Sequence, residues 1–215
     1  MDRGVGDGRD SLQNYNEFLK QYFERENRDF VTFLIQELDL GYQSRILQLG
    51  SGAGWLSLEL ARRLPEASIV GLESDQALVQ MASQNLKHMK LANLRFMCGE
   101  LDQLDIFPNR SFDAVISNQQ LHRWKSPQRI FNEFNRLLEK GGKYAIGDTR
   151  RDLKALAKLV IWFRSLTMPG AFRASWRSDL AGSYTVSEVV QLLLQTKLKD
   201  WKIRSSLFDL LIYKP

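Results

Sequence analysis

Short apolar runs that alternate with helical stretches constrain the fold of this chain more than any other feature. Runs with strand character lie at residues 45–49, 68–73, 94–98, 112–117 and 141–148. The stretches between them carry apolar residues at helical spacing. Because strands buried on both faces read as nearly continuous apolar runs, this alternation predicts a parallel sheet covered by helices on both sides. The sequence therefore predicts a doubly wound α/β fold.

The two ends of the chain add to this core. Residues 1–40 predict a flexible polar leader followed by one or two amphipathic helices rich in aromatic residues. Residues 41–215 predict the core, with an irregular insertion that resembles a lid at 167–184. The last fifteen residues, "WKIRSSLFDLLIYKP", predict two short strands joined by a polar turn, which brings the sheet to seven strands.

Composition limits the function classes. The chain has 215 residues, a net charge of +5 and a single cysteine, Cys98, with only His88 and His122 as histidines. One cysteine excludes an internal disulfide and a cysteine-built zinc site, and so few histidines disfavour a metal centre. No apolar run approaches the ~20 residues of a membrane span, and the start has no signal-peptide pattern. We expect a cytoplasmic protein without a metal.

The turn "GSGAGW" after the first strand places three alternating glycines, Gly50, Gly52 and Gly54, where ligands bind in such sheets. Glycine lets the chain turn tightly and lets a ligand lie against the backbone. The dinucleotide fingerprint G-x-G-x-x-G/A needs a small residue where this chain has Trp55, which disfavours NAD and FAD. Glu73, at the end of the second strand, can accept hydrogen bonds from a ribose diol. That contact would suit NAD as well as other nucleosides, so Glu73 alone does not decide the ligand.

Five segments in order carry a family resemblance: "ILQLGSGAGWLSLELAR", "IVGLESD", "FMCGELDQLDIFPNRSFDAVISNQQLHRW", "FNRLLEKGGKYAIGD" and "GSYTVSEVVQLLLQTKLKDWKI". With these five segments in this order, the chain resembles the class I S-adenosylmethionine-dependent methyltransferases. It is most similar in style to the small-molecule branch that includes the ubiquinone and menaquinone biosynthesis enzymes. The resemblance implies a Rossmann-like fold with S-adenosylmethionine as cofactor and S-adenosylhomocysteine as its product.

The resemblance also implies a set of cofactor-binding residues. They are Gln48, Gly50, Ser51, Gly52, Gly54, Glu73, Ser74, Glu100, Leu101 and Asn118. Glu73 would bind the ribose hydroxyls, Ser74 would border the adenine, and Glu100 would accept from the adenine amino group. Leu101 would offer its backbone amide to the ring. Asn118 and the glycine turn would lie along the methionine part.

One departure from the family pattern is Gln48, because the family usually has an acid at this position. A glutamine can still form hydrogen bonds with the cofactor, but it brings no charge. Charge-assisted hydrogen bonds are roughly twice as strong as neutral ones. We therefore expect a weaker hold on the cationic end of the cofactor.

Candidate acceptor-site residues come from two parts of the chain. His122 and Trp124, in "LHRW", match the family's common histidine and aromatic residue. His122 is a candidate general base by its pKa range; the alternative is a structural role under the loop after the fourth strand. Tyr15 and Tyr22 lie seven residues apart, so they share one helix face and could both point into an acceptor pocket beneath an N-terminal lid.

Three functions stay open from the sequence. The first is a methyltransferase for a small aromatic or acidic molecule. Basic residues between 150 and 177 could attract an acidic substrate. The second is an RNA- or protein-directed methyltransferase, favoured only by the basic charge, so a nucleic-acid partner is not expected. The third is a cofactor-binding partner protein without turnover, for which Gln48 is the only hint. The oligomeric state has no signal in the sequence.

Overall fold

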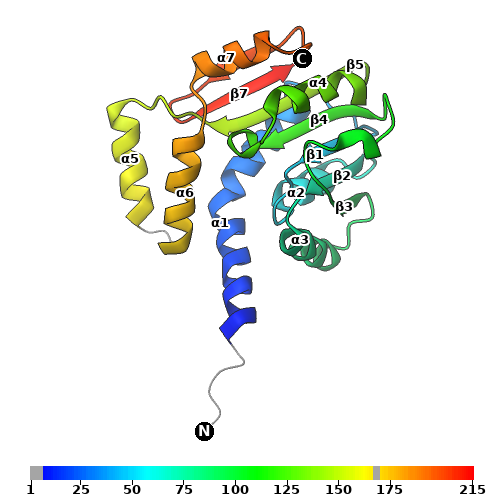
Figure 1. Cartoon of the computed structure of the whole chain (residues 1–215). Coiled ribbons are helices and arrows are strands. Elements are labelled where there is room, and N and C mark those ends of the chain that lie inside the picture. Colours follow the sequence, from blue (N-terminus) through cyan, green and yellow to red (C-terminus); the bar gives the residue numbers. More distant parts are fainter. Residues whose placement is uncertain (1–6, 167–169) are drawn as a thin grey trace.

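The computed structural model describes residues 7–166 and 170–215, and a seven-stranded sheet lies at its centre (Figure 1). The strands are β1 (Arg45–Leu49), β2 (Ser68–Glu73), β3 (Leu94–Cys98), β4 (Phe112–Asn118), β5 (Leu138–Thr149), β6 (Lys202–Ser205) and β7 (Asp209–Lys214). Their order is β3-β2-β1-β4-β5-β7-β6. Strands β1 to β5 pair in parallel, whereas β7 is antiparallel to both β5 and β6. The predicted doubly wound α/β fold is confirmed.

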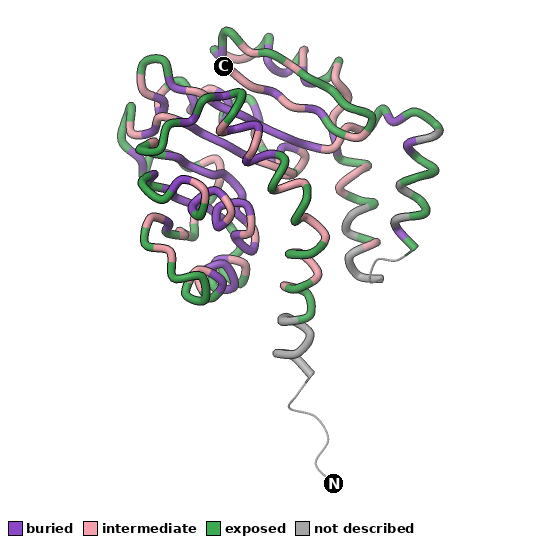
Figure 2. The backbone as a smooth tube through the Cα atoms, turned by 180° about the vertical axis from the view of Figure 1, so that it is seen from behind, coloured by how far each residue is buried: buried purple, intermediate pink, exposed green. Residues whose placement is uncertain are grey.

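Helices cover both faces of this sheet. They are α1 (Asp7–Gln36), α2 (Trp55–Arg63), α3 (Gln76–Met89), α4 (Pro127–Leu137), α5 (Ala155–Leu166), α6 (Gly170–Gly182) and α7 (Val186–Leu194), with 3-10 turns η1 (Leu104–Ile106) and η2 (Leu121–Arg123). One hydrophobic cluster joins the sheet to α4 and α7, and a second joins it to α1 and α2. Buried residues therefore concentrate around the strands and thin out along α1, α5 and α6 (Figure 2).

Local sequence signals set several boundaries. Asp75 caps α3 by accepting hydrogen bonds from the backbone N–H groups of Ala77 and Leu78. Thr185 and Glu188 form the predicted capping box at the start of α7. Because β1, β2 and β4 run in parallel, their carboxyl ends meet at one edge of the sheet. This edge is where a ligand site is expected.

Two predicted segments differ in the structure. Residues 170–182 form α6 rather than an irregular insertion, while 167–169 lie outside the described residues. Phe172, Trp176 and Leu180 recur every four residues, which is a helical signal that the flanking Pro169 and Gly182 obscured. The helix after Pro127 ends at Leu137, so β5 begins before the Gly-Gly pair that was predicted to open it.

Helix α1 is one continuous helix that belongs to both the core and the periphery. Its carboxyl-terminal part is buried in the core through Phe30, Val31, Phe33 and Leu34. Its amino-terminal part extends beyond the sheet (Figure 1). Most of the predicted polar leader, residues 1–6, lies outside the described residues. Across the described ranges, no helix combines the length and apolar character needed to cross a bilayer.

Candidate functional site

A cavity of about 240 Å³ opens at the carboxyl ends of β1 and β4. Its walls come from α1, the glycine turn, the loop after β4, α6 and the turn between β6 and β7. Eight of the residues predicted from the sequence line it: Tyr15, Tyr22, Gln48, Gly50, Ser51, Gly52, Asn118 and His122. The fold thus brings distant parts of the chain together at the edge where a ligand was expected.

The glycine turn has a backbone that side chains would disturb. Gly50, Gly52 and Gly54 all have positive φ values, 72°, 54° and 86°. A Cβ on Gly50 would come within 2.4 Å of Gln120, whereas a Cβ on Gly52 would meet no heavy atom within 4 Å. The neighbouring Ser51 hydroxyl is buried without a hydrogen-bond partner. Open space beside bare backbone, together with an unpartnered polar atom, is the chemistry expected of a site that holds a polar ligand.

Glu73 shapes this turn from the end of β2. Its carboxylate accepts hydrogen bonds from the backbone N–H groups of Gly52 at 2.8 Å, Ser74 at 2.9 Å and Asp75 at 3.1 Å. A carboxylate has about four acceptor positions. A ribose diol would therefore share these oxygens with the turn. Glu73 is 5% exposed and is not among the residues that line the cavity.

Gln48 is fixed by a contact that the sequence did not reveal. The Ser57 hydroxyl, on the first turn of α2, donates a hydrogen bond to the Gln48 side-chain oxygen. Both residues are buried, and Gln48 also lines the cavity. Position 48 thus ties β1 to α2 while offering an uncharged amide to a ligand.

The other predicted cofactor residues lie along the same edge, outside the cavity. Ser74 follows Glu73 directly, and Gly54 packs against Phe96. Glu100 lies 3.7 Å from Lys125 in an exposed ion pair, and Leu101 packs against the core. Since Ser74, Glu100 and Leu101 follow β2 and β3, a ligand that reached them would extend from the cavity across the ends of these strands.

His122 is held between two carboxylates. Its Nδ1 lies 2.8 Å from Asp148, and its backbone N–H donates to the same carboxylate at 2.8 Å. Its Nε2 lies 3.6 Å from Asp179 on α6. Burial opposes the charged imidazolium, but the Asp148 and Asp179 carboxylates outweigh it and raise the pKa of His122 from 6.5 to about 9. The raised pKa disfavours the predicted role as a general base at neutral pH, and the contacts with Asp148 and Asp179 favour the structural alternative.

Trp124 does not occupy the predicted pocket position. Its ring packs edge-on against Phe131 at 5.4 Å and Phe134 at 6.3 Å, and the residue is 5% exposed. His122 lies in the 3-10 turn η2 and Trp124 caps its end, so the two side chains point to different surroundings. Trp124 is therefore a core residue that does not line the cavity, unlike the pocket position expected for it.

Tyr15 and Tyr22 line the cavity from one face of α1, at the predicted seven-residue spacing. Tyr22 stacks on Phe18 at 5.4 Å. Burial raises the pKa of Tyr15, and Arg123 and Asp179 also act on its charge. The interaction with these two residues shows that α1 faces η2 and α6 across the cavity.

A hydrogen-bond network that the sequence did not indicate anchors α1 over the site. Asn16 on α1 exchanges hydrogen bonds with Asn85 on α3 at 2.8 and 3.1 Å. The Trp55 indole N–H donates to the Asn16 side-chain oxygen at 3.1 Å. The bulky residue that breaks the dinucleotide pattern therefore holds the helix that forms one wall of the cavity.

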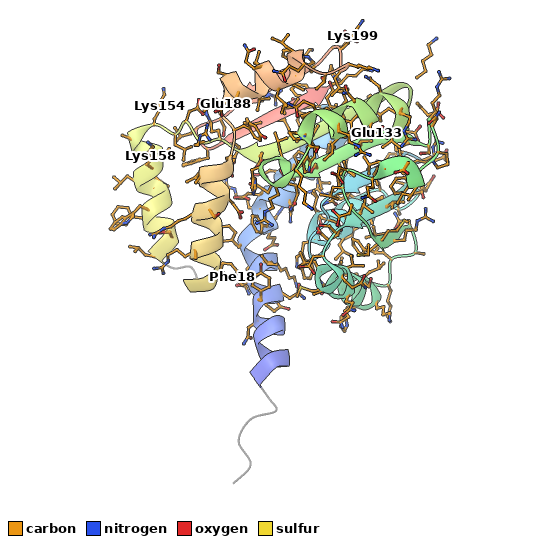
Figure 3. All side chains as sticks on the ribbon, in the orientation of Figure 1. Phe18, Glu133, Lys154, Lys158, Glu188 and Lys199 are labelled. Atoms are coloured by element: carbon orange, nitrogen blue, oxygen red, sulfur yellow. The ribbon has the colours of Figure 1, made fainter. Side chains whose placement is uncertain are left out.

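The basic residues predicted to attract an acidic substrate do not gather at the cavity. Arg150 pairs with Asp152 at 2.7 Å, and Arg151 pairs with Glu188. Lys154 directly precedes α5 and Lys158 lies on it, both away from α1 (Figure 3). Of the basic side chains in the described ranges, only Arg123 and His122 line the cavity, and both contact Asp179.

Three further residues of the site escaped the sequence reasoning. Asp148 is buried near the end of β5, where it contacts His122 without lining the cavity; it could have been found, since an acid at the carboxyl end of a predicted strand lies at the ligand edge. Asp179 carried no signal because α6 was not predicted. Phe208 enters the lining from the turn between β6 and β7, which only the tertiary fold places there. Within the described ranges, no three His, Cys, Asp or Glu side chains form a metal-binding group.

Comparison with known proteins agrees with this geometry. Residues 41–196 match the methyltransferase domain family, and the chain belongs to that family. The arsenite methyltransferase of Halobacterium salinarum is 31% identical over 104 residues, which cover 48% of this chain and 26% of that protein. The malonyl-[acyl-carrier protein] O-methyltransferase of a Paenibacillus species is 28% identical over 127 residues, covering 59% and 42%. The matched regions thus span less than half the length of either relative.

A solved structure extends the likeness to the whole fold. It is a protein of Methanococcus maripaludis provisionally assigned as an S-adenosyl-L-methionine-dependent methyltransferase. It superposes with a TM-score of 0.77 at 19% identity and covers 100% of this chain and 96% of its own. At this identity the likeness establishes the fold alone.

Proposed function

We propose that the protein is an S-adenosylmethionine-dependent methyltransferase that acts on a small molecule with an aromatic body. Membership of the methyltransferase domain family supports the reaction class. The observation that carries the rest is the cavity, because it joins the glycine turn to an aromatic wall on α1. Its small volume favours a compact acceptor over a protein or RNA segment.

The glycine turn fits the methionine end of this cofactor. Gly52 leaves open space beside its backbone, and the buried Ser51 hydroxyl has no protein partner. Gln48 and Asn118 add uncharged polar groups at the ends of β1 and β4. Glu73, Ser74, Glu100 and Leu101 remain the proposed ribose and adenine contacts. When bound, the cofactor would supply a methyl group on a positively charged sulfonium.

The protein's own contribution is to orient the acceptor and exclude water. Methyl displacement needs an aligned nucleophile, and orientation alone can lower a barrier by on the order of 7–11 kcal/mol in favourable cases. Helix α1 supplies the acceptor wall through Tyr15 and Tyr22. His122 acts as a positioning residue, since its charge links η2 to Asp179 on α6.

The lining favours an aromatic acceptor over an acidic one. Apolar and aromatic side chains from α1, α6 and the β6–β7 turn face the cavity, including Leu19, Phe23 and Phe208. Three carboxylates also line it, against only two cationic side chains that already contact Asp179. These carboxylates would repel the negative charge of an acidic acceptor. The biosynthetic branch and the acceptor atom have no comparable support.

Calorimetry and turnover test this proposal. We expect binding of S-adenosylmethionine and S-adenosylhomocysteine and little binding of NAD; tight NAD binding without S-adenosylhomocysteine binding would reject it. In turnover assays, small phenols or aromatic amines should release S-adenosylhomocysteine, whereas aliphatic dicarboxylates should not. Tyr22→Ala should raise KM for the acceptor and leave cofactor affinity unchanged. Tyr42→Ala, an exposed tyrosine outside the cavity, is the matched control.

A further inference from the structure

Helix α5 carries its large apolar side chains on the outside of the protein. Leu159, Trp162, Phe163 and Leu166 follow the i, i+3, i+4, i+7 spacing of one helix face, and each is about half exposed, 49–57%. Among the side chains of α5 that the structure describes, the buried ones are small: Ala157 and Ser165 are 0% and 2% exposed. An ordinary surface helix turns its large apolar residues toward the core, whereas these four are turned outward.

Positive charge surrounds this outward apolar face. Residues 153–178 contain five basic residues and no aspartate or glutamate. Lys154, just before α5, and Lys158, on its first turn, are exposed (Figure 3), and no carboxylate in the described part of the chain pairs with either of them. The nearby acids that could neutralise them are engaged, since Asp152 pairs with Arg150 and Glu188 with Arg151.

We propose that the outer face of α5 binds an anionic lipid surface. A helix with an apolar face, flanking lysines and an exposed aromatic pair has the pattern of a segment that lies in the membrane interface. Trp162 and Phe163 contact each other edge-on at 4.9 Å and form the most prominent part of the face. Anionic headgroups complement Lys154 and Lys158.

A second copy of the chain fits this face less well. A two-fold dimer would bring the same patch of both copies together. Lys154 and Lys158 would then face their own counterparts, with no acid between residues 153 and 178 to offset the repulsion. A lipid surface avoids this conflict because its charge is opposite.

The position of α5 connects the surface to the cavity. Helices α5 and α6 follow each other in the chain and lie side by side at one end of the molecule in both views (Figures 1 and 2). Helix α6 supplies cavity residues, among them Asp179 and Leu180. Lipid bound on α5 would therefore place the cavity near the bilayer. The lipid contact itself does not depend on the proposed methyl transfer.

The test is co-sedimentation of the full-length protein with vesicles. We expect binding to phosphatidylcholine vesicles that contain phosphatidylglycerol, weak binding to phosphatidylcholine alone, and loss of binding as salt rises. Lipids brominated in the acyl chain should quench tryptophan fluorescence, and Trp162→Phe should remove most of this quenching. Binding that is equal on neutral and anionic vesicles, or absent from both, would overturn the proposal.

Two paired variants locate the contact. Trp162→Ser with Phe163→Ser should reduce partitioning roughly tenfold or more. Leu194→Ser with Tyr42→Ser, which removes two large side chains elsewhere that are more exposed than Trp162 and Phe163, should not reduce it. Circular dichroism should show both variants folded. An unchanged affinity of the α5 variant would place the contact elsewhere. If the wild type forms a dimer, the α5 variant is monomeric and the wild type binds no lipid, then a second copy of the chain covers this face and the proposal is wrong.

Discussion

Replacing Asp148 with asparagine should lower the pKa of His122 and remove a pH-dependent part of the protein's stability. Asp148 contacts the His122 ring at 2.8 Å in a buried site, and the neutral amide keeps the shape of the carboxylate without its charge. Burial, no longer opposed by this carboxylate, then disfavours the imidazolium. The pKa of His122 should fall from about 9 toward its ordinary value, while Asp179, which stays 3.6 Å from Nε2, keeps part of the rise.

The size of the effect follows from the pKa of His122. A rise from 6.5 to about 9 corresponds to roughly 3 kcal/mol of extra stabilisation of the charged form in the folded state. Because the folded pKa exceeds the unfolded one, this stabilisation is fully present below about pH 6.5. It is lost as the pH rises through about 9. Asp148→Asn should therefore cost more stability at pH 6 than at pH 10, by roughly 2–3 kcal/mol.

Two measurements check this reasoning. Urea unfolding at pH 6 and pH 10 gives the pH-dependent difference in the free energy of unfolding. The hydrogen bonds from the backbone N–H groups of His122 and Thr149 to Asp148 add a cost that is the same at both pH values. NMR titration gives the pKa of His122 directly, with His88→Gln identifying the other histidine. Asp152→Asn is the matched control. A wild-type His122 that titrates near 6.5, or one unaffected by Asp148→Asn, would refute the account.

Three further outcomes are expected. Glu73→Ala should weaken S-adenosylhomocysteine binding by about 1.5–3 kcal/mol, roughly tenfold or more in Kd, by calorimetry; unchanged affinity in a folded variant would make Glu73 a bystander. Gln48→Glu should tighten S-adenosylmethionine more than S-adenosylhomocysteine, because only the former carries the sulfonium charge; equal tightening would place the effect on their shared amino group. Asn16→Ala should expose the amino-terminal part of α1 to proteases and lower stability by about 1–2 kcal/mol, and an unaltered digestion pattern would show that the network with Asn85 and Trp55 does not anchor the helix.

Features encoded in local pattern were predictable from the sequence. The strands around Leu47 and Val115 are apolar runs, and the capping box at Thr185 is a fixed spacing, so both were found. The position of the glycine turn at the ligand edge also followed, because parallel strands end together. These signals depend on residues close in the chain.

Features set by tertiary direction were not predictable. His122 and Trp124 are two residues apart, yet one faces buried acids and the other enters the aromatic core. The bond from Ser57 to Gln48 and the bond from Trp55 to Asn16 join different elements, and neither leaves a trace in spacing. Asp179 came to the site only because residues 170–182 are helical. Side-chain direction in short turns and contacts between elements require the folded chain.

The continuity of α1 limits how molecules enter and leave the cavity. From Arg9 to Gln36 the helix contains neither glycine nor proline, and its end is locked in the core by Val31 and Leu34. Such a helix is expected to be rigid, because it contains no residue at which it would readily bend. Helix α6, on the opposite wall, begins and ends with glycine, at Gly170 and Gly182. Because α1 is rigid, we expect any change in the width of the cavity to come from movement of α6 relative to α1.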